Sequence, residues 1–312
     1  MLVRNCKVIA TYFGLRRKFP HTGTNTITML QDSIENEINL NPGVQQLDII
    51  LVNHDCGHYE GNDYLNSIHN LKTYCGRVIV LHRDWSDGVG MSMNSFEYAF
   101  KTFKNKYDYW FFQEDDYKIM EKEYYGKGIK LLNWKKETAF VGYDMGTIYE
   151  SLKDKNSILT YKLMKFIFFI PILWWGYGRY LREHNRVIEK IIRLIKNNKL
   201  HHASGPTGMT HKDYLNEVLN KYGKLPYPEL PNPNHNKKDF KRFKGGPISK
   251  VIKTFIFYNH YITWWWLYVI LGEVEFTSVY YDMGYNIQPY PSKNNTIYSY
   301  KINQFKKYKL IN

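Results

Sequence analysis

The chain has few cysteines: among its 312 residues there are three, Cys6, Cys56 and Cys75. Cysteines this few and this scattered supply neither a disulfide framework nor a zinc site, so we expect a reducing, cytoplasmic compartment. The N-terminal residues, MLVRNCKVIATYF, run directly into a predicted strand and show no signal peptide. No apolar run reaches the roughly 18–20 residues that a membrane-spanning helix needs.

Recognition motifs for nucleic acid are also missing, since the sequence shows neither a zinc-finger spacing nor an aromatic RNA-binding signature. The formal charge of +14, from 43 basic and 29 acidic residues, nevertheless favours anionic partners such as nucleotide diphosphates or a lipid surface. An AT-biased genome, whose codons favour lysine and asparagine, would produce the same excess of basic residues without any functional consequence. We therefore expect no nucleic-acid partner and keep a nucleotide diphosphate as a candidate ligand.

Apolar and polar segments alternate through the first half of the chain in the manner of an α/β fold. Strands are predicted at residues 7–13, 47–52, 77–81, 107–113 and 138–143, and helices at 28–40, 92–104 and 212–222. Strands and helices in this order indicate a mostly parallel, Rossmann-like sheet flanked by helices. Such sheets bind their ligands beyond the carboxyl ends of the strands.

The middle of the chain has a different composition. An apolar, aromatic segment at residues 157–178 precedes a predicted basic amphipathic helix at 179–199. This pair fits either peripheral contact with an anionic membrane surface or two buried helices on the acceptor side. Residues 225–246 form a loop rich in proline, asparagine and lysine, which we expect to be mobile or to be ordered by substrate.

Three consecutive carboxylates, Glu114, Asp115 and Asp116, follow the predicted strand at residues 107–113. Like charges this close repel each other unless a cation neutralises them. Mg²⁺ and Mn²⁺ prefer oxygen ligands and also bridge to the phosphates of a nucleotide. The triplet therefore predicts a divalent metal site, and a solvated acidic loop is the alternative.

An acidic triplet at the end of a strand, in a β/α half that starts at the N-terminus, resembles the DxD motif of GT-A fold glycosyltransferases. The nearest resemblance is to the large inverting nucleotide-sugar glycosyltransferase family (glycosyltransferase family 2-like). It implies that Asp116 is the main metal ligand and that Glu114 or Asp115 contacts the ribose or the metal. It also implies a nucleotide-diphosphate sugar as the donor and Mn²⁺ or Mg²⁺ as the cofactor.

Two further segments of the first half resemble that family's donor site. Residues 53–57 (NHDCG) follow the second strand, where the family has a short Asp-containing loop that meets the base and ribose. Residues 87–94 (DGVGMSMN) resemble its glycine-started helix beside the donor, although Met93 replaces the usual Arg. Thr11 and Tyr12, at the end of the first strand, complete the expected donor site. Its residues are then Thr11, Tyr12, Asn53, Asp55, Asp87, Asn94, Glu114 and Asp115.

Residues 205–218 (GPTGMTHKDYLNEV) resemble the family's second glycine-containing strand-loop and the helix after it, which support the acceptor side. Gly208 is accordingly a candidate for contact with the acceptor. His211, where the family often has Arg, is either a third metal ligand or an ordinary polar residue. Trp265 and Trp266 either stack on sugar rings of the acceptor or belong to the core.

The segment at residues 272–285 (GEVEFTSVYYDMGY) resembles the family segment in which an acidic residue opens a helix that ends at Gly-Tyr. In inverting members this segment supplies the carboxylate that deprotonates the acceptor hydroxyl. The match places Glu273 at the position of the base and makes Glu275 the second candidate. Alternatively, Glu273 is acidic only because a negative charge near the start of a helix is favourable.

The sequence as a whole predicts one continuous GT-A domain, with a donor half at residues 1–150 and an acceptor-side region at 151–312. It would transfer a sugar to a hydroxyl of a glycan, lipid-linked or protein acceptor with inversion at the anomeric carbon. Three alternatives stay open: a retaining transferase, a nucleotidyltransferase, and a non-catalytic carbohydrate-binding protein on a transferase fold. The nucleotidyltransferase would need a glycine-rich phosphate loop after the first strand, for which residues 14–18 (GLRRK) are a faint candidate.

Overall fold

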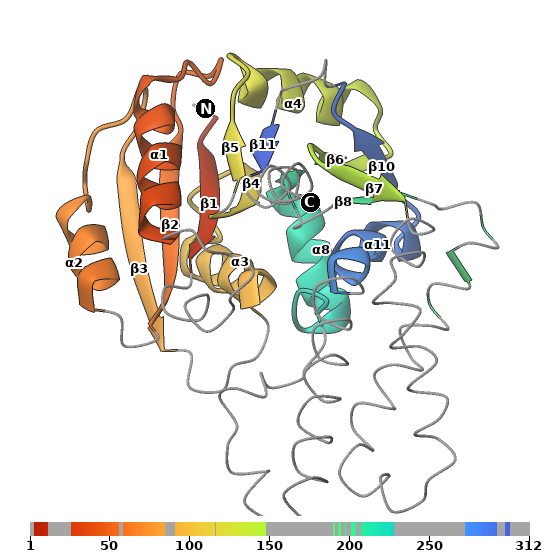
Figure 1. The fold of residues 1–312 in the computed structure, drawn as a ribbon. Coiled ribbons are helices and arrows are strands. Elements are labelled where there is room, and N and C mark those ends of the chain that lie inside the picture. The colour runs from red at the N-terminus through yellow and green to blue at the C-terminus, as the bar shows by residue number, and fades with distance from the viewer. Residues whose placement is uncertain are drawn as a thin grey trace, which may run out of the picture.

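A seven-stranded sheet forms the centre of the computed structural model, in the strand order β10-β6-β9-β4-β1-β2-β3 (Figure 1). The structure describes residues 3–11, 26–55, 59–84, 91–115, 117–147, 190, 193–194, 197, 201–203, 207–227, 272–291 and 297–299. The strands are β1 (Asn5–Thr11), β2 (Asp48–Asp55), β3 (Val78–Asp84), β4 (Tyr109–Glu114), β6 (Thr138–Gly142), β9 (Gly208–His211) and β10 (Asn286–Pro289).

The sheet is mostly parallel. β1 pairs in parallel with β2 on one side and β4 on the other, and β3 and β10 are parallel to their neighbours β2 and β6. Within the seven strands, only β9 runs in the opposite direction, antiparallel to both β4 and β6. This is the α/β, Rossmann-like architecture that the alternation of elements predicts.

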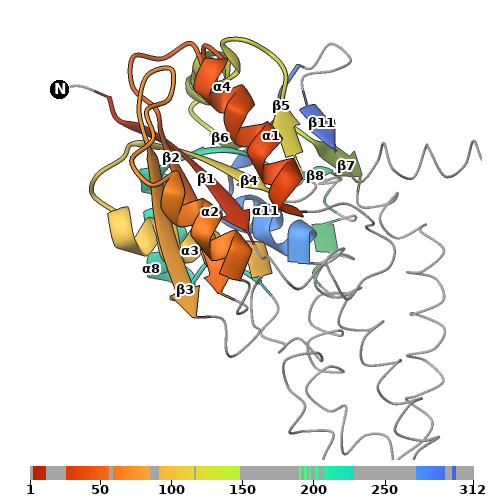
Figure 2. The ribbon, with the colours of Figure 1, turned by 60° about the vertical axis from the view of Figure 1, so that its left-hand side comes forward.

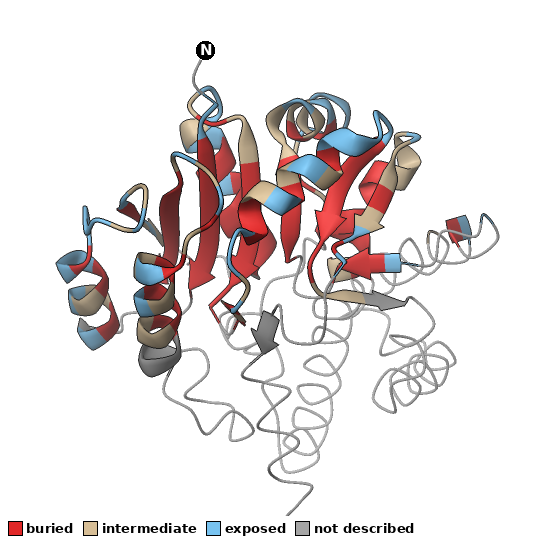
Figure 3. Cartoon of the chain, turned by 90° about the horizontal axis from the view of Figure 1, so that it is seen from above, coloured by how far each residue is buried: buried red, intermediate tan, exposed pale blue. Residues whose placement is uncertain are grey.

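Helices cover both faces of the sheet, which explains why its interior strand β1 is buried along its whole length (Figure 3). The apolar side chains of α1 (Thr26–Asn39), α2 (Tyr59–Ser67) and α4 (Tyr124–Trp134) pack on one face. Those of α3 (Met91–Phe103), α8 (Lys212–Tyr222) and α11 (Gly272–Asp282) pack on the other. Figure 2 shows α1 and α2 together in front of β1, β2 and β3.

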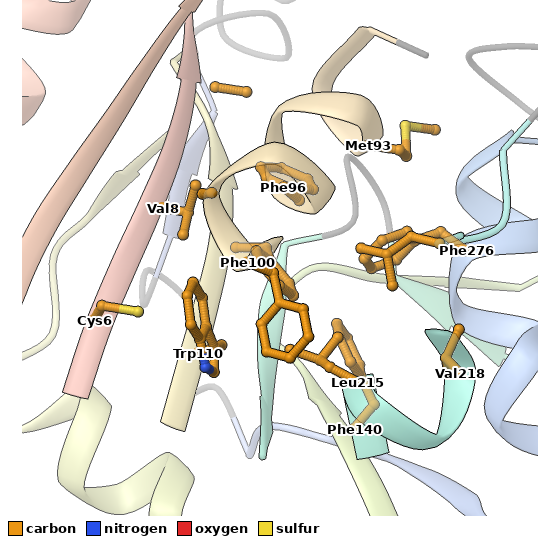
Figure 4. Close-up of a cluster of buried hydrophobic side chains, with 14 of the residues drawn as sticks. Cys6, Val8, Met93, Phe96, Phe100, Trp110, Phe140, Leu215, Val218 and Phe276 are labelled. Carbon is orange, nitrogen blue, oxygen red and sulfur yellow. The ribbon is translucent and has the colours of Figure 1, made fainter. Parts of the chain in front are cut away.

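The core under α3, α8 and α11 is rich in aromatic side chains (Figure 4). Phe100 of α3 meets Trp110 of β4 edge to face, with ring centroids 4.9 Å apart. Phe140 of β6 stacks on Tyr280 of α11 at 5.6 Å. These contacts fix two helices from distant parts of the chain to the same face of the sheet, each with the edge-on or offset geometry that aromatic pairs prefer.

Two short antiparallel strand pairs lie outside the main sheet. β5 (Tyr117–Ile119) pairs with β11 (Ile297–Ser299), and β7 (Met145–Thr147) pairs with β8 (His201–Ala203). The first pair joins the end of the chain to the segment that follows the acidic triplet. Both pairs bring the second half of the chain back onto the first.

A buried ion pair lies under the sheet on the side of α1. Lys7 of β1 is fully buried, and its ammonium contacts the carboxylate of Glu37 in α1, which also accepts a 3.0 Å hydrogen bond from Tyr124 of α4. The ammonium also lies 5.2 Å from the ring centroid of Phe111. Burial lowers the pKa of Lys7, and the charge of Glu37 opposes that shift.

The sequence predictions match this fold within about two residues for three of the helices. The predicted helices at 28–40, 92–104 and 212–222 correspond to α1, α3 and α8, and the predicted first strand at 7–13 corresponds to β1, with its last two residues outside the described ones. The reversed direction of β9 and the helix α4 were not predicted. The predicted segment at 157–178 lies outside the described residues, as do most of 179–199 and all of the predicted loop at 225–246 except residues 225–227. Among the described residues, no helix is both long and apolar enough to cross a bilayer.

Candidate active site

The carboxyl ends of β1, β2, β3 and β4 meet at one edge of the sheet because these strands are parallel neighbours. Thr11, Asn53 and Glu114 all lie at this edge, which we call the carboxyl edge. Gly208 also lies near it, because β9 is antiparallel and begins opposite Phe112 of β4. The structure therefore brings together four of the predicted site residues from four different strands.

Glu114 is the last residue of β4 and is 8% exposed. Ser92, in the first turn of α3, donates a 2.7 Å hydrogen bond from Oγ to Oε1 of Glu114. Asp115 is fully buried, and its backbone N–H donates to the carbonyl of Ala10 at 3.2 Å, which extends the pairing of β4 with β1. Asp116 lies outside the described residues.

Thr11 and Asn53 belong to a buried hydrogen-bond network. Both side chains are fully buried, and the Thr11 hydroxyl lies 3.4 Å from Oδ1 of Asn53. The Asn53 amide nitrogen is 2.7 Å from Oδ1 of Asn62 in α2 and 3.2 Å from Nδ1 of His82 in β3. All polar atoms of the Asn53 side chain therefore face protein groups, so this residue shapes the carboxyl edge from beneath its surface.

His54 links β2 to α3 at the same edge. Its ring is fully buried, with Nε2 bonded to Oγ of Ser95 and Nδ1 3.5 Å from a guanidinium nitrogen of Arg83. Because arginine is always a donor, Nδ1 accepts and Nε2 carries the proton that is donated to Ser95. Ser92 and Ser95 thus attach the first turn of α3 to β4 and to β2, across the end of β1.

Three phenylalanines connect α3, β4 and α11 just below the carboxyl edge. Phe96 stacks on Phe112 with ring centroids 4.8 Å apart, and Phe276 meets Phe112 at 5.8 Å and Phe96 at 6.0 Å, both edge to face. Phe96 and Phe276 are labelled in Figure 4, where they project from α3 and α11. We call Phe96, Phe112 and Phe276 the phenylalanine triad.

Glu273 and Glu114 each lie a few residues from a member of the phenylalanine triad. Glu114 is two residues beyond Phe112 on the same face of β4, about 7 Å further along the strand. Glu273 is three residues before Phe276, or about 5 Å along the helix axis, and α11 begins at the carboxyl edge because it leads into β10, which is parallel to β6. Glu273 is half-buried there, whereas Glu275 is 3% exposed.

His211 lies at the opposite edge of the sheet. It pairs with Tyr109 at the start of β4, and five residue steps of roughly 3.3 Å, about 16 Å, separate that position from Glu114 along the strand. The His211 ring caps α8 by accepting from the backbone N–H of Asp213 at 3.3 Å and contacts the Tyr109 ring. The structure does not bring His211 to the acidic residues, and it has no place in a metal site with Glu114.

Gly208 has a packing reason for being glycine. A Cβ atom at this position would lie 2.4 Å from Cε1 of Phe140 and 2.5 Å from the carbonyl oxygen of Val141. Asn94 lies in the first turn of α3 and is half-buried, and Asp55 ends β2. The other predicted contacts of donor and acceptor lie outside the described residues: Tyr12, Asp87, Trp265 and Trp266.

A divalent cation fits the acidic residues of the carboxyl edge in charge and in ligand chemistry. Glu114 is a buried carboxylate at the end of β4, and oxygen ligands of this kind are those that Mg²⁺ and Mn²⁺ prefer. Within the part of the chain that the structure describes, no three histidine, cysteine, aspartate or glutamate side chains are grouped to hold a metal. The fit therefore depends on Asp116 as a further ligand.

Ser92, His54 and the phenylalanine triad were not singled out from the sequence. The one available signal for Ser92 is its spacing, four residues before Phe96 on the apolar side of the predicted helix. A serine at the start of a helix normally indicates a cap, so the pattern alone does not point to Glu114.

Comparison with known proteins finds no matching family model and no matching curated protein. Solved structures with partial likeness include S. aureus TarS 1–349, with 14% identity, 46% of this chain and 36% of that chain covered, and a TM-score of 0.29. Mouse xyloside xylosyltransferase 1 has 7% identity, covers 49% of this chain and 59% of that chain, and has a TM-score of 0.30. The match therefore spans less than two thirds of either protein.

A CMP:2-keto-3-deoxy-manno-octonic acid synthetase in complex with CTP covers 99% of this chain and 98% of its own, with 9% identity and a TM-score of 0.40. All three scores are below 0.5, so these likenesses assign neither a family nor a reaction. The function has to be argued from the carboxyl edge itself.

Proposed function

We propose that the protein is a metal-dependent glycosyltransferase that moves a sugar from a nucleotide-diphosphate donor to an acceptor hydroxyl with inversion. The observation that supports this proposal is the phenylalanine triad, which packs α3, β4 and α11 together two residues before Glu114 on β4 and three residues after Glu273 on α11. A metal-binding carboxylate and a separate carboxylate base are the two acidic functions that this reaction needs.

Glu273 is the proposed base. It takes the proton of the acceptor hydroxyl as the acceptor oxygen bonds to the anomeric carbon and the bond from that carbon to the diphosphate oxygen breaks. The structure supports Glu273 over Glu275 because Glu273 is half-buried on the side of the triad, whereas Glu275 is almost wholly enclosed within the fold. A base has to reach a substrate, and Glu273 has the more accessible carboxylate.

Glu114 and Asp116 are the proposed pair of metal ligands. Side chains alternate between the two faces of a strand, and the hydrogen bond from Asp115 N–H to Ala10 continues the strand pairing through Asp115. Asp115 is therefore expected on the face opposite Glu114, which leaves Asp116 as the partner of Glu114 in the proposed pair. When bound, the cation would stabilise the negative charge that develops on the leaving diphosphate.

The reaction itself is tested by incubating the protein with a panel of nucleotide sugars and Mn²⁺ and identifying the products. A released nucleoside diphosphate supports glycosyl transfer, and released pyrophosphate would replace the proposal by nucleotidyl transfer. Sugar binding without turnover of any donor would indicate a non-catalytic carbohydrate-binding protein. A product with the donor's anomeric configuration would remove Glu273 from the role of base.

Substitutions test the two carboxylate roles separately. Asp116→Ala is expected to abolish both donor hydrolysis and transfer, while Asp213→Ala, an exposed acid at the opposite edge, leaves both unchanged. Glu273→Gln is expected to lower kcat for transfer by about 10²–10⁴, the usual contribution of a general base, with donor affinity retained. Full transfer activity in Glu273→Gln would contradict the assignment of the base.

A further inference from the structure

We infer that Ser92 is a positioning residue that holds the Glu114 carboxylate in the orientation needed for metal binding, an inference that rests on the proposed function. Ser92 is 1% exposed and Glu114 is 8% exposed, and the distance from Ser92 Oγ to Glu114 Oε1 is 2.7 Å. A hydrogen bond to a buried carboxylate at this distance is of the strong, charge-assisted kind.

The hydroxyl proton of Ser92 goes to Glu114. Ser92 Oγ has one proton to donate, and its acceptors among the described residues are Oε1 of Glu114 at 2.7 Å and the sulfur of Met93 at 3.4 Å. A thioether is a weak acceptor and an ionised carboxylate is a strong one. The bond therefore fixes the direction of the Glu114 carboxylate, whose side chain otherwise has several rotatable bonds.

The position of Ser92 is itself held rigidly. Ser92 is one helical turn before Phe96, which packs in the phenylalanine triad, and three residues before Ser95, whose hydroxyl bonds to the buried ring of His54. The first turn of α3 is thus attached to β4 and β2 on either side of β1. Ser92 therefore acts on Glu114 as a fixed donor, in the way that second-layer residues orient metal ligands.

The orientation matters because the metal and the base approach the substrate from different elements. Glu114 lies on β4 and Glu273 on α11, and both are placed by the same triad. A Glu114 carboxylate that rotates freely would change the distance between the cation and the acceptor without any change in the fold. Loss of the Ser92 hydroxyl is therefore expected to weaken metal binding more than it lowers stability.

The test compares Mn²⁺ affinity in the wild type with that in Ser92→Ala, Ser92→Thr and Ser95→Ala, by calorimetric titration of the full chain. The titration is done with saturating UDP or GDP, whichever raises the Tm of the wild type more. Ser92→Ala is expected to weaken Mn²⁺ binding by about 10–100-fold, the usual loss when a second-layer partner is removed. Ser92→Thr keeps a hydroxyl and is expected to restore most of the affinity.

Ser95→Ala is the matched control, because it removes a buried hydroxyl from the same helical turn whose partner is His54 rather than Glu114. Its Mn²⁺ affinity is expected to fall far less than that of Ser92→Ala, because the Ser92 hydroxyl is kept and Phe96 still holds the turn in the phenylalanine triad. Unchanged affinity in Ser92→Ala, or an equal loss in Ser92→Ala and Ser95→Ala, would overturn the positioning role while the proposed function stood. A wild type that binds no Mn²⁺ with either nucleotide would instead overturn the proposed function, and this inference with it.

Discussion

The substitution Gly208→Ala tests whether Gly208 is glycine for packing or for contact with an acceptor. The added Cβ would lie 2.4 Å from Cε1 and 2.5 Å from Cζ of Phe140, and 2.5 Å from the carbonyl oxygen of Val141. The Phe140 ring cannot rotate away freely, because it stacks on Tyr280 at 5.6 Å. The carbonyl oxygen belongs to β6, which is paired with β9 and β10.

Relief of these contacts requires β9 or β6 to move, so the cost belongs at the upper end of the range for overpacked cores, about 3 kcal/mol. In a domain of about 150–250 residues, a loss of that size lowers the Tm by about 6–12 °C. Thermal unfolding followed by circular dichroism measures the shift. The reference is Gly223→Ala, where φ is +75° but no atom lies within 4 Å of the added Cβ, so only backbone strain is introduced.

The packing explanation requires Gly208→Ala to be clearly less stable than Gly223→Ala, with the KM for the acceptor unchanged in the protein that remains folded. Equal stability of Gly208→Ala and the wild type would refute the reasoning. A raised acceptor KM at unchanged Tm would return Gly208 to the acceptor site that the sequence predicts.

Two further predictions concern charged groups away from the proposed site. Lys7→Ala leaves the Glu37 carboxylate buried without its cation and is expected to lower the free energy of unfolding by about 3–5 kcal/mol in a denaturant titration. The control Lys101→Ala removes a half-exposed partner of Glu97 and should lower it by about 0.5 kcal/mol. Similar losses of stability in the two variants would contradict the buried pair. Burial lowers the pKa of His211 below 6.5, so the unfolded chain takes up the proton first and stability is lost as the pH falls below 6.5. The difference in free energy of unfolding between pH 7 and pH 5 is therefore expected to be smaller in His211→Gln than in the wild type, and an unchanged difference would contradict this role.

How far the sequence predicts this fold depends on how local the determining interactions are. The helix α8 was predicted to the residue, because its apolar spacing and the glycine that ends it, Gly223, are both local signals. The helix α4 was missed because Gly126 and Gly128 lower its helix propensity. Both positions require glycine because of groups far away in the sequence. A Cβ atom at Gly126 would lie 2.3 Å from the carbonyl oxygen of Gly43, and one at Gly128 would lie 2.2 Å from the hydroxyl of Tyr143.

The candidate site was predicted in its acidic residues and not in what surrounds them. The end of a strand next to carboxylates is visible in the sequence, so Glu114 was located. Polar residues at the same edge were predicted as donor contacts, but a sequence does not show whether an amide faces a ligand or another side chain. The structure shows that the Asn53 amide faces Asn62 and His82. The network that holds the edge is therefore visible only once β1, β2 and β3 are side by side.

The reversed strand β9 explains why one short segment contributes to both edges of the sheet. β9 begins with Gly208 beside Phe112, near the carboxyl edge, and ends with His211 beside Tyr109, at the opposite edge. A parallel strand in its place would start at the edge away from Glu114. The chain returns to the sheet through α11, which packs on one face of it. Phe276 of α11 lies between Phe112 of β4 and Phe140 of β6, on either side of β9, with ring centroids 5.8 and 6.4 Å away. The distance between the proposed metal ligand and the proposed base therefore depends on aromatic packing across β9. A change in the volume of residue 276 should alter kcat more than it alters nucleotide affinity.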